Sequence, residues 1–372
     1  MGKHAGDRGH HHLADPAHPG SRPRRRAPRR DAPNHAHLKE HQLMKKSLKK
    51  MEIGTAVSVA PGRVDGMLQV GSLPDGSPME IPVIIVRGAE DGPVVWMHGC
   101  VHGNEYCGAF SIHALTRELT LQRGTVVALP VLNITGFQRQ QRMSPFDGYN
   151  GGDLNRCFPG KPGGTLTEQM AFHIYQHLRE HATHFVDVHT AFTADTRWAL
   201  FAPPSGDKAD VAHGMARAFG FENTLPTPLD TLGGSALIEA AKEGIPGLII
   251  EAGGIGSAFS PETVADCAER FRNVLRHLDM LPGETTEYGG LTLFSNFAWV
   301  NATRGGLFRP AVKCGNRIAE GDLVGRYYDV FGDLVEEAKS PFSGIVLAIG
   351  GGPVMPNGEI LVHVGLDPQP AR

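Results

Sequence analysis

Short apolar runs alternate with helical stretches between residues 81 and 278, and this alternation limits the fold more than any other feature of the sequence. Apolar runs bounded by Gly and Pro are typical of buried strands. Strands are expected at Ile81–Val86, Val94–Met97, Val126–Leu132, Phe185–Val188 and Leu248–Ile250. Helices are expected at Asn104–Leu119, Thr167–Glu180, Ala209–Phe219, Ser235–Glu243 and Pro261–Leu278. The alternation predicts an α/β fold, with a mostly parallel or mixed sheet that carries helices on both faces.

The two ends of the chain differ from this region. Residues 1–50 carry 13 Lys and Arg against 4 Asp and Glu, and they show no helical or strand period. We therefore expect a disordered basic tail over residues 1–55. After residue 283, short strands, many glycines and no helical pattern predict a barrel-like all-β module over residues 284–372. A catalytic domain is then expected over residues 56–283.

Three interpretations of the tail stay open on sequence grounds. It is a dispensable segment or an over-extended translation start, with Met44 or Met51 as the real beginning. Alternatively, its arginines contact nucleic acid, or His10-His11-His12 binds metal adventitiously. The net charge of the whole chain is only −3, so a nucleic-acid partner is not expected.

The cysteines and the hydropathy pattern exclude other classes of protein. Five scattered Cys without CxxC spacing argue against a disulfide framework, and a cytoplasmic location is expected. No apolar run approaches the length of a membrane span, and the N-terminus has no apolar signal-peptide region. We therefore expect no membrane partner, whereas a homo-oligomer is left open.

Metal-ligating residue types follow two of the expected strands. His102 and Glu105 lie three residues apart after Val94–Met97, at the start of a helix, so both side chains can face one point. His189 ends another strand, and Asp187 on the same face could orient its ring. Two imidazoles and a carboxylate suit a catalytic zinc ion. Each residue alone is also explained by a capping Glu or a buried core His, and His98 and His113 are competing candidates that we expect to be structural.

A third strand end carries the candidate base. Glu251 follows Leu248–Ile250 and precedes two glycines, a placement that packing explains poorly. As a general base it would take a proton from the attacking water. The glycines that follow lack the full GxGxxG spacing of a dinucleotide loop. A nucleophilic Cys100 or Cys107 is the competing chemistry, but no Cys/His arrangement follows from the spacing.

Two loops supply candidate substrate-binding residues. Asn155 and Arg156 lie in a polar loop, where an Arg fork and an amide can bind a carboxylate. Arg142, in an upstream loop, could stabilise the oxyanion that forms on the attacked carbonyl. For each loop arginine, the alternative is a solvated surface charge.

The motifs, taken in order, closely resemble those of the succinylglutamate desuccinylase/aspartoacylase family. They are HGCVHGNE at residues 98–105, DLNRCFPG at 153–160, DVH at 187–189 and IIEAGG at 249–254. The resemblance runs from about residue 65 to the end and implies a zinc carboxypeptidase-like fold. The resemblance implies that one Zn²⁺ per chain is bound by His102, Glu105 and His189, and that Glu251 is the catalytic carboxylate. It also implies that Asn155 and Arg156 bind the substrate's carboxylate, and that Arg142 polarises the scissile carbonyl.

Two features refine the resemblance. The family more often has two glycines before the first zinc-binding His, where this chain has Cys100-Val101. The glycine-rich C-terminal module looks more like that of members similar to N-acetyl-diaminobutyrate deacetylases. Part of this module resembles a biotinyl/lipoyl-type hairpin, but its tip, residues 348–353, has no lysine to carry a cofactor. We therefore expect a structural cover over the active-site entrance.

These observations predict a zinc-dependent hydrolase that cleaves the amide bond of a small N-acyl amino acid or N-acyl diamino acid. Two other functions remain open. One is a metallocarboxypeptidase acting on peptides, and the other is a non-catalytic binding protein on the same scaffold. Retention of the base and of all three ligands argues against the binding protein.

Overall fold

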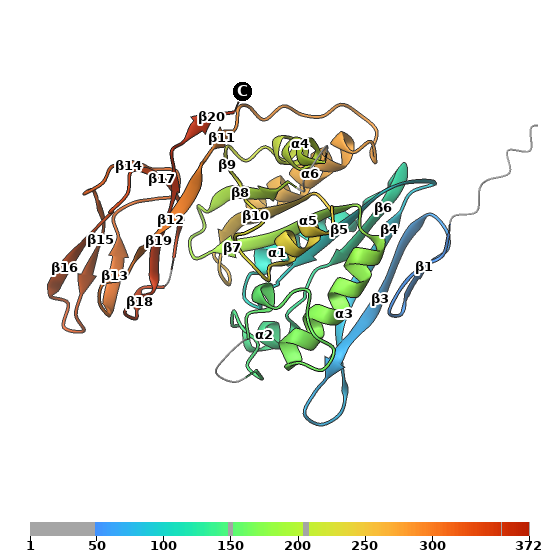
Figure 1. Ribbon diagram of the computed structural model, residues 1–372, viewed down its shortest axis with the longest axis horizontal. Coiled ribbons are helices and arrows are strands. Elements are labelled where there is room, and N and C mark those ends of the chain that lie inside the picture. The colour runs from blue at the N-terminus through green and yellow to red at the C-terminus, as the bar shows by residue number, and fades with distance from the viewer. Residues whose placement is uncertain (1–48, 148–151, 204–207, 351, 372) are drawn as a thin grey trace, which may run out of the picture. The chain divides into compact units, whose positions relative to one another are not determined.

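The fold is built around one large mixed sheet. The computed structural model describes residues 49–147, 152–203, 208–350 and 352–371. Within these residues the sheet has ten strands (Figure 1). From edge to edge they are β20 (Gln369–Pro370), β11 (Thr292–Leu293), β9 (Asn223–Pro226), β8 (Arg197–Ala202), β10 (Gly247–Gly254), β7 (His184–Ala191), β5 (Glu90–Gly99), β6 (Arg123–Leu129), β4 (Pro78–Arg87) and β3 (Gly62–Ser72). The central β10, β7, β5 and β6 are parallel, whereas β8 and β4 pair antiparallel with β10 and β6, which confirms the predicted mostly parallel or mixed sheet.

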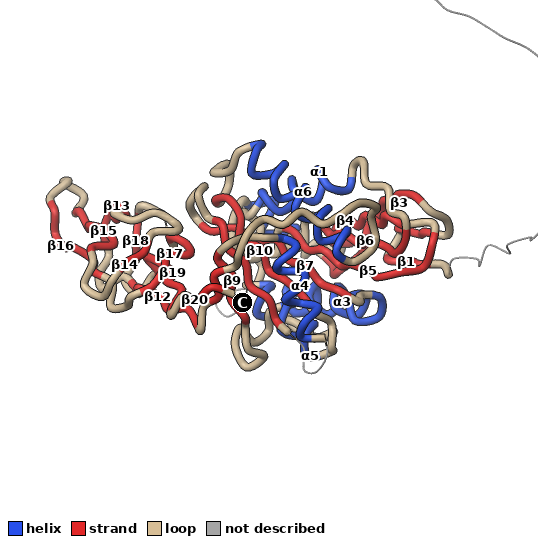
Figure 2. The backbone as a smooth tube through the Cα atoms, turned by 90° about the horizontal axis from the view of Figure 1, so that it is seen from above, coloured by secondary structure: helices blue, strands red, loops and turns tan. Residues whose placement is uncertain are grey.

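Helices cover both faces of this sheet, as predicted. One face carries α1 (Tyr106–Thr116), α4 (Ala209–Phe219) and α6 (Pro261–His277), and the other carries α3 (Leu166–His181) and α5 (Ala236–Lys242). Figure 2 shows α1 and α6 on the side opposite α3 and α5. Each face therefore has its own apolar core, with Trp96 and Phe185 under α3 and α5, and Met97 and Phe271 on the side of α6. The short helices α2 (Ile134–Arg139) and η2 (Leu154–Arg156) lie in loops.

Local capping chemistry sets the helix boundaries. Helix α3 begins one residue before its predicted start, because Thr165 and Glu168 form a capping box whose two side chains bond to each other's backbone N–H. The Ser260 side chain caps α6, which has Pro261 in its first turn. Helix α4 ends at Gly220, which adopts the left-handed conformation. The strands and helices expected between residues 81 and 278 are all present, with boundaries shifted by a few residues.

The N-terminal part of the described chain forms a hairpin. Strand β1 (Met51–Ile53) pairs antiparallel with β2 (Ala56–Ser58), and Met51 and Ile53 are buried. The segment predicted to be a disordered tail therefore contains a strand at its end, because these two apolar side chains join the core. The rest of that prediction, the arginine run and His10-His11-His12 lie in residues 1–48, outside the described residues.

The C-terminal module is rich in strands, as predicted, and has two small antiparallel sheets. One contains β12 (Asn296–Asn301), β19 (Ile360–Leu366), β17 (Gly344–Ile349) and β14 (Arg317–Ile318). The other contains β16 (Leu334–Lys339), β15 (Leu323–Tyr328), β13 (Gly306–Pro310) and β18 (Val354–Met355). Strands β11 and β20, which flank the module in sequence, extend the main sheet and so tie the module to it.

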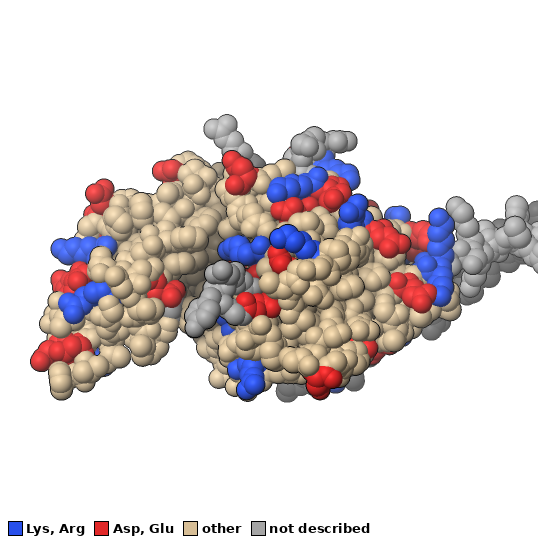
Figure 3. Space-filling view, turned by 60° about the horizontal axis from the view of Figure 1, so that its bottom comes forward, with Lys and Arg blue, Asp and Glu red and all other residues tan. Residues whose placement is uncertain are grey.

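The surface charge and the length of the helices can be compared with the expectation of no nucleic-acid and no membrane partner. Figure 3 shows Lys and Arg interspersed with Asp and Glu over the described part of one face. Such mixing offers a polyanion no continuous basic surface there. Among the described residues, no helix is both long and apolar enough to cross a membrane.

Candidate active site

The turn after β5 places two of the candidate metal ligands. Cys100 adopts a left-handed conformation (φ 46°), and a Cβ on Gly103 would overlap the backbone of Gly136 and Phe137 in α2. Glycine is therefore required where this turn packs closely against α2. Glu105 is the N-cap residue of α1, but its side chain makes no capping hydrogen bond. The alternative that Glu105 only caps the helix is thus wrong, because its carboxylate points elsewhere.

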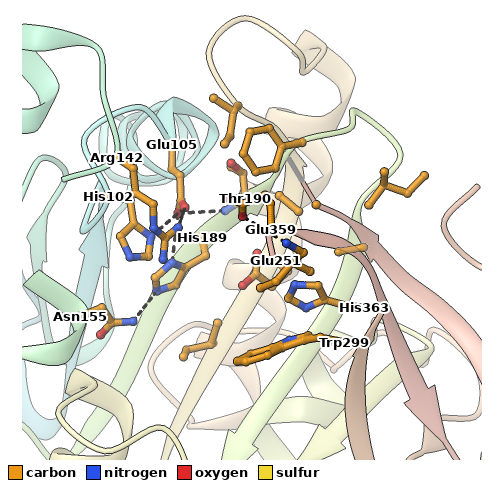
Figure 4. Close-up of a pocket in the computed structure, with 18 of the residues that line it drawn as sticks. His102, Glu105, Arg142, Asn155, His189, Thr190, Glu251, Trp299, Glu359 and His363 are labelled. Carbon is orange, nitrogen blue, oxygen red and sulfur yellow. Dashed lines mark hydrogen bonds and ion pairs between the residues drawn. The ribbon is translucent and has the colours of Figure 1, made fainter. Parts of the chain in front are cut away.

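The carboxylate of Glu105 instead lies between two imidazoles (Figure 4). Its Oε1 is 2.8 Å from His102 Nδ1, and its Oε2 is 3.0 Å from His189 Nδ1. The backbone N–H of Thr190 also donates to Oε2, at 3.1 Å. His102 and His189 are each 3% exposed and Glu105 is 1% exposed, so the structure brings the three predicted ligands into one buried cluster.

Both imidazoles are held from behind by further carboxylates. His102 Nε2 lies 3.1 Å from Asp153 Oδ1, and His189 Nε2 lies 3.1 Å from Asp187 Oδ2. An Nε2 proton donated to Asp153 would leave the lone pair of His102 Nδ1 free for a cation, and Asp187 lies where it can orient the ring of His189. Two imidazole Nδ1 atoms and a carboxylate oxygen form the donor set of a catalytic zinc site, and carboxylates behind the histidines are its usual support. The residues therefore fit a divalent cation of the zinc type.

The charged groups of the cluster shift one another's pKa values. Burial alone would raise the pKa of Glu105, but His102 and His189 hold the pKa of this carboxyl well below its usual range. Asp153 is similar, since burial opposes its ionisation while His102 and Arg142 keep its pKa low. The pKa of His189 is raised despite burial, because Asp187 and Glu105 both face it. Carboxylates with lowered pKa values therefore flank both imidazoles of the cluster.

Glu251 lies beside His189 on the neighbouring strand. The two residues are register partners in the parallel pair of β10 and β7, and both line one cavity of 490 Å³. Burial raises the pKa of Glu251 to about 7, and Glu105 adds to the rise, against the attraction of His189. A carboxylate whose pKa lies near neutrality can both take up and release a proton at physiological pH.

The three other predicted site residues line the same cavity. Arg142, with a side chain 41% exposed, donates to Glu105 Oε1 and to Asp153 Oδ2, each at 3.3 Å. Asn155 is buried; its Oδ1 accepts the N–H of Ala236 at the start of α5. Arg156 is exposed, and its Nη1 donates to the carbonyl of Asn155 at 2.7 Å.

The far wall of the cavity comes from the C-terminal module. Phe297, Trp299, Glu359 and His363 line the cavity opposite the metal cluster, and Figure 4 shows Trp299 beside His363. His363 stacks on Phe297 with an angle of 9° between the rings. Sequence reasoning predicted a cover but named none of these side chains. The contact of Asp153 with His102 does not follow from the sequence either, and only the position of Asp153 in the DLNR motif hints at it.

The competing candidates lie outside this cavity. His98 is buried in the core; its Nε2 accepts the indole N–H of Trp96 at 2.7 Å, and burial lowers its pKa to about 4. His113 is exposed on α1. Cys100 is buried, and burial raises the pKa of its thiol to about 12, so it stays protonated. Cys107 is also buried and does not line the cavity. A cysteine nucleophile is therefore not supported.

Comparison with known proteins identifies the family. The family model for the succinylglutamate desuccinylase/aspartoacylase catalytic domain matches residues 91–278, about half of the chain. The chain belongs to this family. Its members are deacylases, so the chain belongs among enzymes that cleave an amide bond to release an acyl group. The resemblance inferred from the ordered motifs is thereby confirmed.

Individual relatives agree with this assignment. The chain is 27% identical over 259 residues to N-alpha-acetyl-L-2,4-diaminobutyric acid deacetylase of Halomonas elongata, over 67% of this chain and 74% of that protein. A solved succinylglutamate desuccinylase/aspartoacylase from Rhodobacter sphaeroides is 26% identical, with a TM-score of 0.70, and the match covers 83% of this chain and 96% of that one. The product-bound ectoine utilization protein of Ruegeria pomeroyi, at 24% identity, has a TM-score of 0.72 over 86% and 98% of the two chains, which supports the fold.

Proposed function

We propose that this protein is a zinc-dependent deacylase that hydrolyses the amide bond of a small N-acyl amino acid or N-acyl diamino acid. One observation carries the proposal: a His–Glu–His cluster, a carboxylate with a pKa near neutrality and two arginines line a single cavity. This combination supplies a metal site, a base and anion-binding groups for one small substrate. The name of the Halomonas elongata relative, a deacetylase of an N-acetylated diamino acid, agrees with this substrate class.

Each side chain takes a distinct part in the proposed reaction. His102, Glu105 and His189 would hold the cation, which would supply Lewis acidity to activate water and polarise the scissile carbonyl. Glu251 takes a proton from the attacking water and passes it to the leaving amine. Asp153 and Asp187 lie 3.1 Å from Nε2 of His102 and of His189, where they orient the two rings so that Nδ1 of each faces Glu105.

The arginines and Asn155 handle the charge of the substrate. Arg142 stabilises the negative charge that develops on the carbonyl oxygen, since its guanidinium lies beside the cluster and is part-exposed to the cavity. Asn155 and Arg156 bind the substrate's carboxylate, because an amide and a guanidinium on adjacent residues both line the cavity. The site therefore favours a substrate with a carboxylate near the amide.

The C-terminal module favours a small substrate over a peptide. The module supplies an aromatic wall opposite the metal cluster, and a cavity of 490 Å³ lies within the usual range for small-molecule sites of about 300–1,000 Å³. A metallocarboxypeptidase needs an open cleft through which the peptide can continue. We therefore propose residues 56–283 as the catalytic domain and residues 284–372 as the module that closes its substrate cavity.

Metal analysis combined with a substrate screen tests the proposal. Purified protein should contain one tightly bound divalent ion per chain in the His–Glu–His site, with zinc preferred over cobalt and manganese. It should hydrolyse one or more N-acetyl, N-succinyl or N-formyl amino acids faster than peptides of matched C-terminal residue. Glu251→Gln serves as the inactive control. Faster turnover of the peptides would favour the carboxypeptidase, and binding of acylated amino acids without turnover would favour a binding protein.

A further inference from the structure

A second group of potential metal ligands lies on the last turn of α3. His177, Glu180 and His181 occupy positions i, i+3 and i+4, so their side chains share one face of the helix. One donor atom from each residue lies within 4.8 Å of the donor atoms of the other two. None of these residues lines the substrate cavity. The cluster is thus separate from the His102–Glu105–His189 site.

The two imidazoles of this cluster are already held in place. Their rings are nearly parallel, with 13° between the planes and 6.1 Å between the centroids. The side chain of His181 is only 19% exposed, and His177 is half-buried, with an Nδ1 that has no hydrogen-bond partner among the described residues. Packing therefore restricts both rings before any ligand binds, which lowers the entropy lost on binding.

Glu180 and the helix end complete the environment for a cation. The Glu180 side chain is 68% exposed, and its Oε2 lies 3.9 Å from His181 Nε2, beyond hydrogen-bond distance. Its carboxylate can therefore turn toward a bound ion. The three residues also lie at the C-terminal end of α3, where unpaired carbonyl groups carry partial negative charge and favour cations.

We propose that His177, Glu180 and His181 form a second site for a divalent transition-metal ion such as Zn²⁺. Two imidazoles and one carboxylate select borderline ions of the zinc, nickel and copper type over Mg²⁺ and Ca²⁺, which prefer oxygen ligands. The spacing His-x-x-Glu-His is the same as in inverted zinc motifs, whose two histidines bind the metal. This site is open to solvent on the Glu180 side, so it binds an exchangeable ion and has no catalytic part.

The position of the site gives the ion a structural effect. Helix α3 ends at His181, and the chain then runs through Ala182 and Thr183 into β7, the strand that carries Asp187 and His189. An ion that ties the last helical turn together stabilises the folded chain by mass action, in proportion to its free concentration. The inference is independent of the proposed deacylase activity, because it concerns other residues and another readout.

Zinc binding to the full-length chain tests the site. The variant His181→Ala should bind one Zn²⁺ ion fewer per chain than the wild type in equilibrium dialysis. The matched control His173→Ala, at an exposed position of α3 one turn before His177, should bind as many ions as the wild type. Comparing variants cancels any binding by the histidines of residues 1–48, which all the proteins share. Circular dichroism establishes that each variant is folded, and Glu180→Gln provides a second variant that leaves both imidazoles in place.

The expected result is a weakening of the second ion's affinity by at least about tenfold in His181→Ala, because even supporting residues of metal sites contribute about 10–100-fold. Added Zn²⁺ should also raise the thermal stability of the wild type more than that of His181→Ala, while His173→Ala should gain as much as the wild type. Equal zinc content and equal stabilisation in the wild type and in folded His181→Ala would overturn the proposal. Equal losses in His173→Ala and His181→Ala would also overturn it, because binding would then not depend on this cluster.

Discussion

Replacing Glu251 by Gln tests the proposed base and its buried environment together. The change keeps the size of the side chain and removes its titrating group. All three proposed metal ligands remain, so the variant should keep its metal. Loss of a general base typically lowers turnover by about 100- to 10,000-fold. The first expectation is therefore an enzyme with normal metal content and very low activity.

The same change should alter how stability depends on pH. The pKa of Glu251 rises from 4.5 to about 7 in the folded chain, chiefly through burial. Each pKa unit is worth about 1.4 kcal/mol, so ionised Glu251 destabilises the metal-free fold by about 3 kcal/mol. The sign follows from the order of the two pKa values. Below pH 4.5 the carboxyl group of Glu251 is protonated in both the folded and the unfolded chain, and it does not destabilise the fold. As the pH rises from 4.5 toward 7, the unfolded chain ionises first, and the free energy of unfolding falls.

Urea unfolding of the metal-free proteins measures this effect. The free energy of unfolding of the wild type should fall relative to that of Glu251→Gln as the pH rises from about 4.5 to about 7, by up to about 3 kcal/mol. Four other charged or titratable groups face Glu251, namely His102, His189, Glu105 and Arg142. Both proteins contain them, so their own effect on the free energy of unfolding largely cancels when the two curves are compared. Glu251→Asp, which keeps a carboxylate, should behave like the wild type. Parallel curves for the wild type and Glu251→Gln, or near-normal turnover in Glu251→Gln, would refute the reasoning.

Four further substitutions probe the rest of the site. His102→Ala or His189→Ala should lose most of the metal of the catalytic site, because each removes an imidazole ligand; metal analysis showing full occupancy of that site in either variant would exclude this ligand set. Asp153→Asn should keep all ligands but weaken metal affinity by about 10–100-fold, which competition with a chelator measures, and unchanged affinity would mean that its contact with His102 Nε2 is incidental. Arg156→Lys should lower kcat/KM sharply for an N-acyl amino acid and little for an N-acyl amine without a carboxylate, because lysine lacks the planar fork; equal losses on both would place the carboxylate pocket elsewhere.

The metal cluster could be predicted because its members follow strands that the sequence marks clearly. Val94–Met97 and Phe185–Val188 are short apolar runs followed by polar residues, and the carboxyl ends of parallel neighbours meet at one edge of a sheet. His102 and His189 were therefore expected to converge. The strand Arg197–Ala202 was not predicted, although it is an apolar run; it follows β7 with no helix between them and so departs from the alternation of strands and helices.

Other parts of the site depend on contacts between distant segments. Asp153 meets His102 across 51 positions of the chain, and the Gly103 N–H next to His102 also donates to the carbonyl of Arg142, at 3.0 Å. Trp299 and His363 reach the cavity through the pairing of β12 with β19, and His363 meets Trp198 of β8 with 6.4 Å between the ring centroids. No local period in a sequence records such contacts, so the identity of the cavity wall had to come from the structure.

Two separate parts of the chain form the cavity wall, so substrate selectivity can evolve separately from the reaction centre. The proposed metal ligands and base lie between His102 and Glu251, whereas the facing aromatic wall lies between Phe297 and His363. Mutations in the second segment can reshape the space available to a substrate without disturbing the first. Chains that share the same reaction centre can thus diverge in the molecules they accept through their last strands alone. Exchanging residues 284–372 between relatives is the corresponding route to altered selectivity by design.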